Sequence, residues 1–121
     1  METVKTPAKA SEPVNKSVNE SRLVSDIIRA TYPFVKLFRA NVGRVKLPDG
    51  RWFSTGLPKG YPDLCGYHRA TGKAVYIECK MPYNKPSEEQ LKFIDEARAA
   101  GAIAAVCYSV QEAVELVTKE L

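Results

Sequence analysis

The chain has 121 residues, of which 45% are hydrophobic and 26% are charged. This length fits one compact domain, since domains usually contain about 100–200 residues, and the composition is typical of globular rather than disordered proteins. The apolar runs are shorter than the roughly 18 residues of a membrane helix, and the N-terminus lacks the apolar stretch of a signal peptide. We therefore expect a globular, cytoplasmic domain.

Cysteine usage points to the same compartment. The three cysteines are an odd number without C-x-x-C spacing, and the single histidine completes no zinc signature. Thiols stay reduced in the cytosol, so we interpret Cys65, Cys79 and Cys107 as small hydrophobic residues. We interpret His68 as an ordinary histidine rather than a metal ligand.

The net charge of +4 is unevenly spread along the chain. Residues 29–59 contain seven Lys and Arg residues against Asp49 alone, whereas residues 86–121 contain seven acidic residues against three basic ones. A basic stretch interleaved with aromatic residues is typical of a surface that contacts a phosphate backbone. The alternative is a solvated face whose aromatic side chains lie in the core. The aromatic residues concerned are Tyr32, Phe34, Phe38, Trp52 and Phe53.

The first elements in chain order are an arm and a helix. Residues 1–18 are polar and contain two prolines, which predicts a flexible arm, followed by a folded domain over residues 19–121. A helix is expected from about Asn19–Glu20, and Pro33 should end it because proline disfavours helical geometry in the residue before it. Its apolar residues recur at the three-and-four spacing of one face, at Leu23, Val24, Ile27 and Ile28.

Residues 34–47 give a mixed pattern, of which only residues 41–47 alternate as a half-buried strand does. Pro48-Asp49-Gly50 is a turn signal, and residues 51–54 return as the partner strand of a hairpin. Residues 56–62 form a loop by composition.

Residues 63–67 and 74–80 predict two neighbouring strands joined by a short loop. Ser87 with Gln90 and Ser109 with Glu112 have the spacing of capping boxes, each opening a helix. The apolar residues 102–108 between them are typical of a buried strand. The expected order is therefore α-β-β-β-β-α-β-α, an α/β fold with a mixed central sheet of about four strands flanked by helices.

Three residues carry the candidate chemistry. On the strand 74–80 side chains alternate between faces, so Glu78 and Lys80 point the same way. This pair alone is compatible with a solvent-facing ion pair. However, Asp63 opens the preceding strand, and the turn between the strands should bring it beside Glu78. Two adjacent carboxylates favour a hard divalent cation such as magnesium, which with a nearby lysine fits phosphodiester hydrolysis.

The motif also has a family resemblance. Pro62-Asp63, fourteen intervening residues and Glu78-Cys79-Lys80 match the PD-(D/E)xK nuclease motif. The wider sequence resembles the VRR-NUC (virus-type replication-repair nuclease) family over about residues 19–117, which implies a restriction-endonuclease-like α/β core. The matching segments are Gly60-Tyr61-Pro62-Asp63-Leu64, Ile77-Glu78-Cys79-Lys80 and Ser87-Glu88-Glu89-Gln90.

The resemblance implies roles for the matching residues. Asp63 and Glu78 would be metal ligands together with the backbone carbonyl of Cys79, and Lys80 would be the catalytic lysine. Gln90 would belong to the catalytic site, although the capping box alone also explains a glutamine at this position.

Two acidic residues on the first helix are further candidates. The resemblance places Glu20 as an additional metal ligand, direct or through water, with Asp26 as the fallback. Glu20 is equally explained by the preference for acidic residues near a helix N-terminus. Met81-Pro82-Tyr83 departs from the glycine-rich sequence common in the family, which leaves the loop after the lysine without a family template.

The resemblance therefore implies a Mg²⁺- or Mn²⁺-dependent endonuclease without an organic cofactor or a membrane partner. We expect selectivity for branched DNA such as a four-way junction, and a two-fold homodimer with Tyr32–Phe38 in its interface. Phage or mobile-element replication and repair is the expected setting. The alternatives are a DNA-binding module that does not cleave and a small protein-interaction domain. The residues expected to hold the DNA backbone are Arg39, Arg44, Lys46, Arg51, Lys59 and Lys85.

Overall fold

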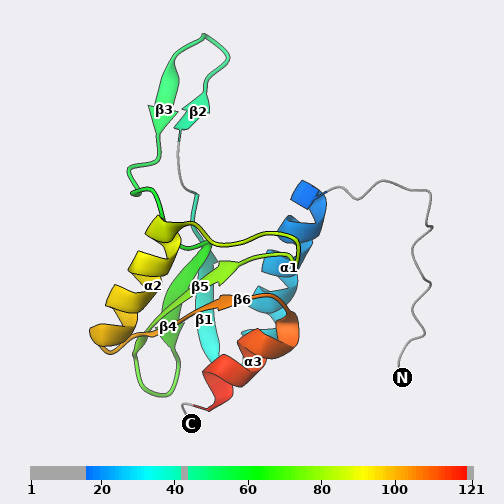
Figure 1. Cartoon of the computed structure of the whole chain (residues 1–121), viewed down its shortest axis with the longest axis vertical. Coiled ribbons are helices and arrows are strands. Elements are labelled where there is room, and N and C mark those ends of the chain that lie inside the picture. Colours follow the sequence, from blue (N-terminus) through cyan, green and yellow to red (C-terminus); the bar gives the residue numbers. More distant parts are fainter. Residues whose placement is uncertain (1–15, 42–43, 120–121) are drawn as a thin grey trace, which may run out of the picture.

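The computed structural model describes residues 16–41 and 44–119 (Figure 1). Most of the arm expected over residues 1–18 lies outside these ranges. The first helix begins at Lys16 rather than near Asn19, and it ends at Thr31, two positions before Pro33 as expected. The elements are α1 (Lys16–Thr31), β1 (Val35–Arg39), β2 (Arg44–Lys46), β3 (Trp52–Ser54), β4 (Leu64–His68), β5 (Ala74–Cys79), α2 (Glu88–Ala99), β6 (Ile103–Cys107) and α3 (Val110–Thr118).

The central sheet has four strands in the order β1-β4-β5-β6. The β1–β4 and β4–β5 pairs are antiparallel and the β5–β6 pair is parallel, which confirms the expected mixed α/β sheet. A parallel pair needs a crossover connection, and α2 supplies it.

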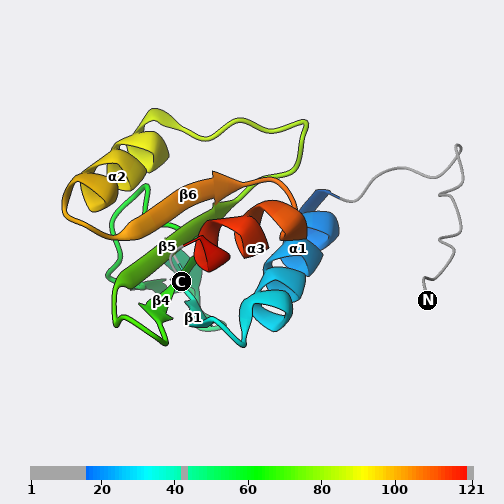
Figure 2. The ribbon, with the colours of Figure 1, turned by 90° about the horizontal axis from the view of Figure 1, so that it is seen from below.

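Helices cover the two faces of the sheet unequally (Figure 2). The buried core lies between the sheet and α1 with α3, where Ile27, Ile77 and Val117 are fully buried. On the other face α2 covers β5 and β6, and the ring of Phe93 packs edge-on against Tyr76 with 5.1 Å between centroids. Successive side chains of β5 therefore alternate between the main core and the α2 side.

Strand β1 was not predicted from the sequence, and the observed order is α-β-β-β-β-β-α-β-α. In this strand Val35 and Leu37 are buried, but the outward position after them is Phe38, which is 53% exposed. An aromatic residue on the solvent side hides the alternation of apolar and polar residues that identifies a half-buried strand.

The expected hairpin is confirmed as β2 and β3, but it forms a separate two-stranded sheet. It projects away from the body of the molecule (Figure 1), and all six of its strand residues are exposed. Trp52 and Phe53 are 56% and 55% exposed, and Tyr32 is 54% exposed. The alternative that the aromatic residues of the basic stretch lie in the core is therefore wrong for these three residues and for Phe38.

The two predicted capping boxes differ. At α2 the Ser87 hydroxyl accepts from the Gln90 amide at 3.1 Å, and the Gln90 side chain accepts from the Ser87 amide at 2.8 Å. At α3 Ser109 accepts from the Glu112 amide, but the Glu112 carboxylate accepts from the amide of Tyr108 instead of Ser109. The second capping box is therefore only half formed.

The three cysteines are free; Cys79 and Cys107 are buried as expected, whereas Cys65 is only partly buried. His68 is fully buried, with Nε2 at 3.2 Å from the Val117 carbonyl oxygen, so it links β4 to α3. Within residues 16–41 and 44–119, none of the helices combines the length and apolar character needed to cross a membrane.

Candidate active site

Strand register brings the two predicted carboxylates together. Leu64 pairs with Ile77 in the antiparallel β4–β5 ladder, so Asp63, one position earlier, lies opposite Glu78. Residues directly opposite each other project from the same face, with Cβ atoms about 4.5–5.5 Å apart. Asp63 Oδ2 also accepts a hydrogen bond from the Cys79 amide at 2.9 Å, which fixes this carboxylate against the end of β5.

The Glu78 carboxylate is buried, since its side chain is only 4% exposed. Its Oε2 atom accepts a hydrogen bond from Gln90 Nε2 at 2.9 Å and lies 3.7 Å from Lys80 Nζ. Its Oε1 atom is buried and has no hydrogen-bond partner within the described part of the chain. One oxygen of this carboxylate is thus left for a proton or a cation.

Lys80 lies directly beyond the end of β5. Its amide donates to the Cys107 carbonyl at 3.1 Å, so β6 holds its backbone in place. Its side chain is 16% exposed and approaches Glu78, whereas Ile77 and Cys79 belong to the core on the opposite face. The predicted alternation is confirmed, and the low exposure is not that of a solvent-facing ion pair.

Burial and charge both act on Glu78. Burial, and next the negative charge of Asp63, raise the pKa of Glu78 to about 8, although the Lys80 ammonium lowers it. At neutral pH the carboxyl group therefore holds a proton unless a cation takes its place.

Gln90 makes a contact that fits each of the two alternatives left by the sequence. Its side-chain oxygen accepts from the Ser87 amide, and its Nε2 donates to Glu78 Oε2. The N-terminal turn of α2 thus orients the buried carboxylate.

The structure does not bring the acidic residues of α1 into a ligand cluster. Among the described residues no group of three or more His, Cys, Asp or Glu side chains is placed to hold a metal ion. Glu20 has only a weak electrostatic effect at the end of β5. The pKa of the Cys79 thiol is raised mainly by burial and next by Asp63, and the charge of Glu20 makes the smallest contribution. Asp26 forms a 3.3 Å ion pair with Arg29.

The oxygen donors at the strand ends nevertheless fit a hard divalent cation. Asp63 and Glu78 supply carboxylate oxygens, and the Cys79 backbone adds a carbonyl oxygen, which are the ligand types that Mg²⁺ prefers. The unpartnered Glu78 Oε1 is the observation that favours a positive charge at this position.

A cleft of about 630 Å³ opens from Asp63 and Gln90 toward the hairpin. Two of the cations expected to hold DNA, Arg39 and Lys59, line it, and Lys59 Nζ also lies 3.7 Å from a Glu89 carboxylate oxygen. Val45 and Phe53 of the hairpin line the same cleft. Neither residue was predicted from the sequence to belong to the site.

The other predicted DNA-binding cations lie outside the cleft. The Arg44 guanidinium is 4.8 Å from the centre of the Trp52 ring, and Lys46 Nζ is 6.0 Å from it. Arg51 forms a 2.7 Å ion pair with Asp49. Lys85 is exposed in the segment between β5 and α2.

Tyr61 also lines the cleft and was not predicted. Its ring packs edge-on against Phe93 at 5.2 Å and Tyr76 at 6.3 Å. Hydrogen bonding with the Cys65 side chain, together with burial, raises its pKa to about 12. Tyr61 therefore stays protonated and anchors the loop that carries Asp63.

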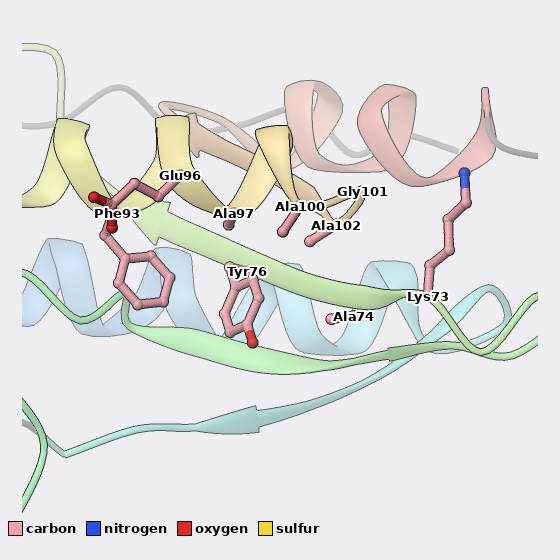
Figure 3. Close-up of a pocket in the computed structure, with 9 residues that line it drawn as sticks. All are labelled: Lys73, Ala74, Tyr76, Phe93, Glu96, Ala97, Ala100, Gly101 and Ala102. Carbon is pink, nitrogen blue, oxygen red and sulfur yellow. The ribbon is translucent and has the colours of Figure 1, made fainter.

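A second hollow of about 500 Å³ lies between α2 and the first residues of β5. Figure 3 shows Phe93, Tyr76 and the alanines at the C-terminal end of α2 around it. None of the predicted site residues lines this hollow, so it is separate from the candidate active site.

The loop before Asp63 depends on Gly60. Its φ is +93°, and an added Cβ would lie 2.8 Å from the Glu89 backbone. Gly60→Ala is expected to lower the free energy of unfolding by about 2–4 kcal/mol, because it combines left-handed strain with overpacking against α2. Gly56→Ala is the matched control, since Gly56 also has a positive φ but nothing within 4 Å of its added Cβ; it should cost about 1–2 kcal/mol. Urea unfolding measures both, and equal losses would contradict the close packing.

Comparisons with known proteins identify the family and support the fold. The family model for the VRR-NUC domain matches residues 7–111. A solved structure described as a VRR-NUC domain is similar with a TM-score of 0.58 and 21% sequence identity, covering 84% of this chain and 97% of that chain. At this identity the structural likeness supports the fold alone. No curated protein matches the sequence.

Proposed function

The chain belongs to the VRR-NUC family of predicted nucleases, and on this premise we propose that it is a metal-dependent endonuclease that hydrolyses DNA phosphodiester bonds. The observation that carries the proposal is the meeting of Asp63, Glu78 and Lys80 at one end of the β4–β5 pair, where Glu78 Oε1 is buried without a partner. Such buried, mutually perturbing ionisable groups beside a cleft are typical of catalytic sites.

In this proposal Asp63, Glu78 and the Cys79 carbonyl hold a Mg²⁺ or Mn²⁺ ion, which when bound polarises the phosphate and lowers the pKa of a water. Gln90 keeps Glu78 turned toward this position through its 2.9 Å hydrogen bond. Lys80 places its side-chain nitrogen there, 3.7 Å from Glu78, and orients the attacking water or stabilises the developing negative charge. Glu20 remains a proposed additional ligand through water.

The direct test is cleavage of a DNA panel with Mg²⁺ or Mn²⁺: duplex, single strand, flap, splayed arm and four-way junction. Metal-dependent cleavage supports the proposal. Binding without cleavage would favour a non-cleaving DNA-binding module on the same fold. No affinity for DNA at low salt would favour a protein-interaction domain, in which the Glu78–Lys80 pair is only structural.

We propose that the basic residues of the hairpin and the cleft hold the DNA backbone. DNA affinity should therefore fall steeply with salt concentration, because phosphate contacts release counterions. Arg44→Ala and Lys46→Ala should each lower the salt slope by about one unit, whereas Arg51→Ala should change it less because Arg51 is already paired with Asp49. Fluorescence anisotropy between about 50 and 200 mM salt measures the slopes. An unchanged slope in the Arg44/Lys46 double variant would place the binding face elsewhere.

We propose a two-fold dimer that prefers four-way junctions, because one chain carries one such site and junction resolution needs two cuts. The uncovered outer face of β1 and β4 supports an interface there. Phe38 and Tyr67 are 53% and 46% exposed on it, and Lys36 Nζ lies 5.3 Å from the Phe38 ring and 5.5 Å from that of Tyr32.

Phe38→Asp should shift the protein from dimer to monomer in light scattering at micromolar concentration, because it places a charge in the apolar contact. It should also remove the preference for a junction over linear duplex. A wild-type monomer that cleaves both DNAs equally would contradict the assembly and leave the catalytic proposal intact.

The proposed setting is replication and repair in a phage or mobile element, in the host cytoplasm. The three free cysteines, two of them buried, fit a reducing compartment.

A further inference from the structure

The hairpin has two chemically different faces. Cross-strand pairing puts Val45 opposite Phe53 and Lys46 opposite Trp52, and opposite residues share a face. One face therefore carries Trp52 with the cations Arg44 and Lys46, and the other is the apolar pair Val45 and Phe53. We call these the cationic face and the apolar face.

The apolar face lines the cleft that contains Asp63 and Gln90. Val45 and Phe53 line the same cavity of about 630 Å³ as Asp63 and Gln90, whereas Trp52, Arg44 and Lys46 do not line it. Phe53 is nevertheless 55% exposed and Val45 is 54% exposed, so the body of the protein leaves most of this face uncovered. A substrate group in the cleft beside Asp63 therefore shares that cleft with the Phe53 ring.

The charges around the cleft indicate an anionic occupant. Arg39 and Lys59 line the cleft. Arg44 and Lys46 lie next to Trp52 on the cationic face of the hairpin. A ligand with a flat apolar surface and a negatively charged chain matches this combination. Exposed aromatic rings flanked by cations are how proteins bind nucleic acid strands, with bases stacked on the rings and phosphates near the cations.

We propose that Phe53, supported by Val45, is a base-stacking site that receives an unpaired nucleobase next to the phosphate that is cleaved beside Asp63. This inference rests on the proposed function and adds a specificity-determining residue to it. Bases inside an intact duplex are stacked on each other and offer no free face to the ring, so Phe53 favours DNA whose strands are separated at the cleavage position. Phosphate contacts position the DNA, and the ring distinguishes paired from unpaired DNA.

The test compares two DNAs of equal length and label, a fully paired duplex and a splayed arm, by fluorescence anisotropy with Ca²⁺ in place of Mg²⁺. Phe53→Ala should weaken binding of the splayed arm by about 5- to 150-fold, the equivalent of ~1–3 kcal/mol of lost stacking. Duplex affinity should change less than about twofold. Phe53→Tyr should restore splayed-arm binding, because it keeps the aromatic face.

Trp52→Ala is the matched control, because Trp52 is as exposed as Phe53 but lies on the cationic face of the same hairpin. It should weaken binding of both DNAs by a similar factor. Trp52 is also the only tryptophan, so an unchanged emission spectrum of Phe53→Ala shows that the hairpin stays folded.

Equal losses for duplex and splayed arm in Phe53→Ala, or no loss for either, would overturn the stacking site. If that happened while wild-type protein cleaved DNA with Mg²⁺, the inference would fail and the nuclease proposal would stand. If binding of the splayed arm depended on Phe53 but the wild-type protein did not cleave DNA, the stacking site would stand and the nuclease proposal would fail. A 2-aminopurine base at the unpaired position gives a second readout, since its fluorescence should be quenched by wild-type protein and not by Phe53→Ala.

Discussion

Alanine at Asp63, Glu78 or Lys80 is expected to lower the rate of DNA cleavage at least ~10³-fold, because catalytic groups that act as one unit lose most of their effect together. Asp63 and Glu78 lie opposite each other across the β4–β5 ladder, and Lys80 Nζ lies 3.7 Å from Glu78 Oε2. Double variants should therefore be scarcely slower than single ones. Single-turnover cleavage with saturating Mg²⁺ measures the effect.

The variants must stay folded for this test to count. The Glu78 side chain is buried and that of Lys80 is half-buried, so Glu78→Gln and Lys80→Met, which preserve side-chain size, accompany the alanine variants. Lys92→Met is the matched control, because Lys92 is an exposed lysine of α2 and its loss should leave the rate within about twofold. Near-wild-type cleavage by a folded Lys80→Met variant would remove Lys80 from the catalytic group.

The meeting of Asp63 with Glu78 was predictable because it depends on short-range rules. Strand alternation sets which way Glu78 points, and a short loop between two strands fixes their register within a few residues. The structure has Leu64 opposite Ile77, the pairing that puts the two carboxylates side by side. The N-terminus of α2 was predictable for the same reason, since its capping box lies within four consecutive residues.

The missed features depend on packing between segments that are distant in sequence. Val35 and Leu37 of β1 are buried by α1 and the rest of the sheet, but Phe38 at the uncovered edge obscured the pattern. The position of the hairpin relative to the cleft likewise follows from no local signal. The alternation of Arg44, Val45 and Lys46 was visible in the sequence, but only the fold shows that Val45 and Phe53 line the same cleft as Asp63.

The two alternatives predicted for Gln90, a capping residue of α2 and a residue of the candidate active site, do not exclude each other. A glutamine side chain has an acceptor oxygen and a donor nitrogen, and here the oxygen caps α2 while the nitrogen binds Glu78. The same side chain thus stabilises the helix and orients the buried carboxylate. Gln90→Glu would keep the acceptor and lose the donor to Glu78, so it separates the two roles.

Chelating the divalent cation is expected to abolish cleavage, and Mg²⁺ affinity is expected to rise with pH. The pKa of Glu78 is about 8 in the protein without metal, so the carboxyl group must release its proton before its oxygens bind a cation. The apparent affinity should therefore increase by up to about tenfold per pH unit below pH 8 and level off above it. Calorimetric titration of Mg²⁺ in two buffers of different ionisation enthalpy should detect close to one proton released per ion.

Thermal unfolding without metal gives an independent check on Glu78. Its pKa rises from an ordinary value of 4.5 to about 8 on folding, so the folded state binds more protons between these values. The stability that this proton contributes is fully present below pH 4.5 and is lost as the pH rises through 8. Relative to Glu78→Gln, the wild-type Tm should fall by at least about 5 °C between pH 6 and 9, corresponding to ~1 kcal/mol, and Mg²⁺ should restore it at high pH. A Tm difference that stays constant with pH, or robust cleavage in chelator without added metal, would show that this carboxylate does not exchange a proton for a catalytic cation.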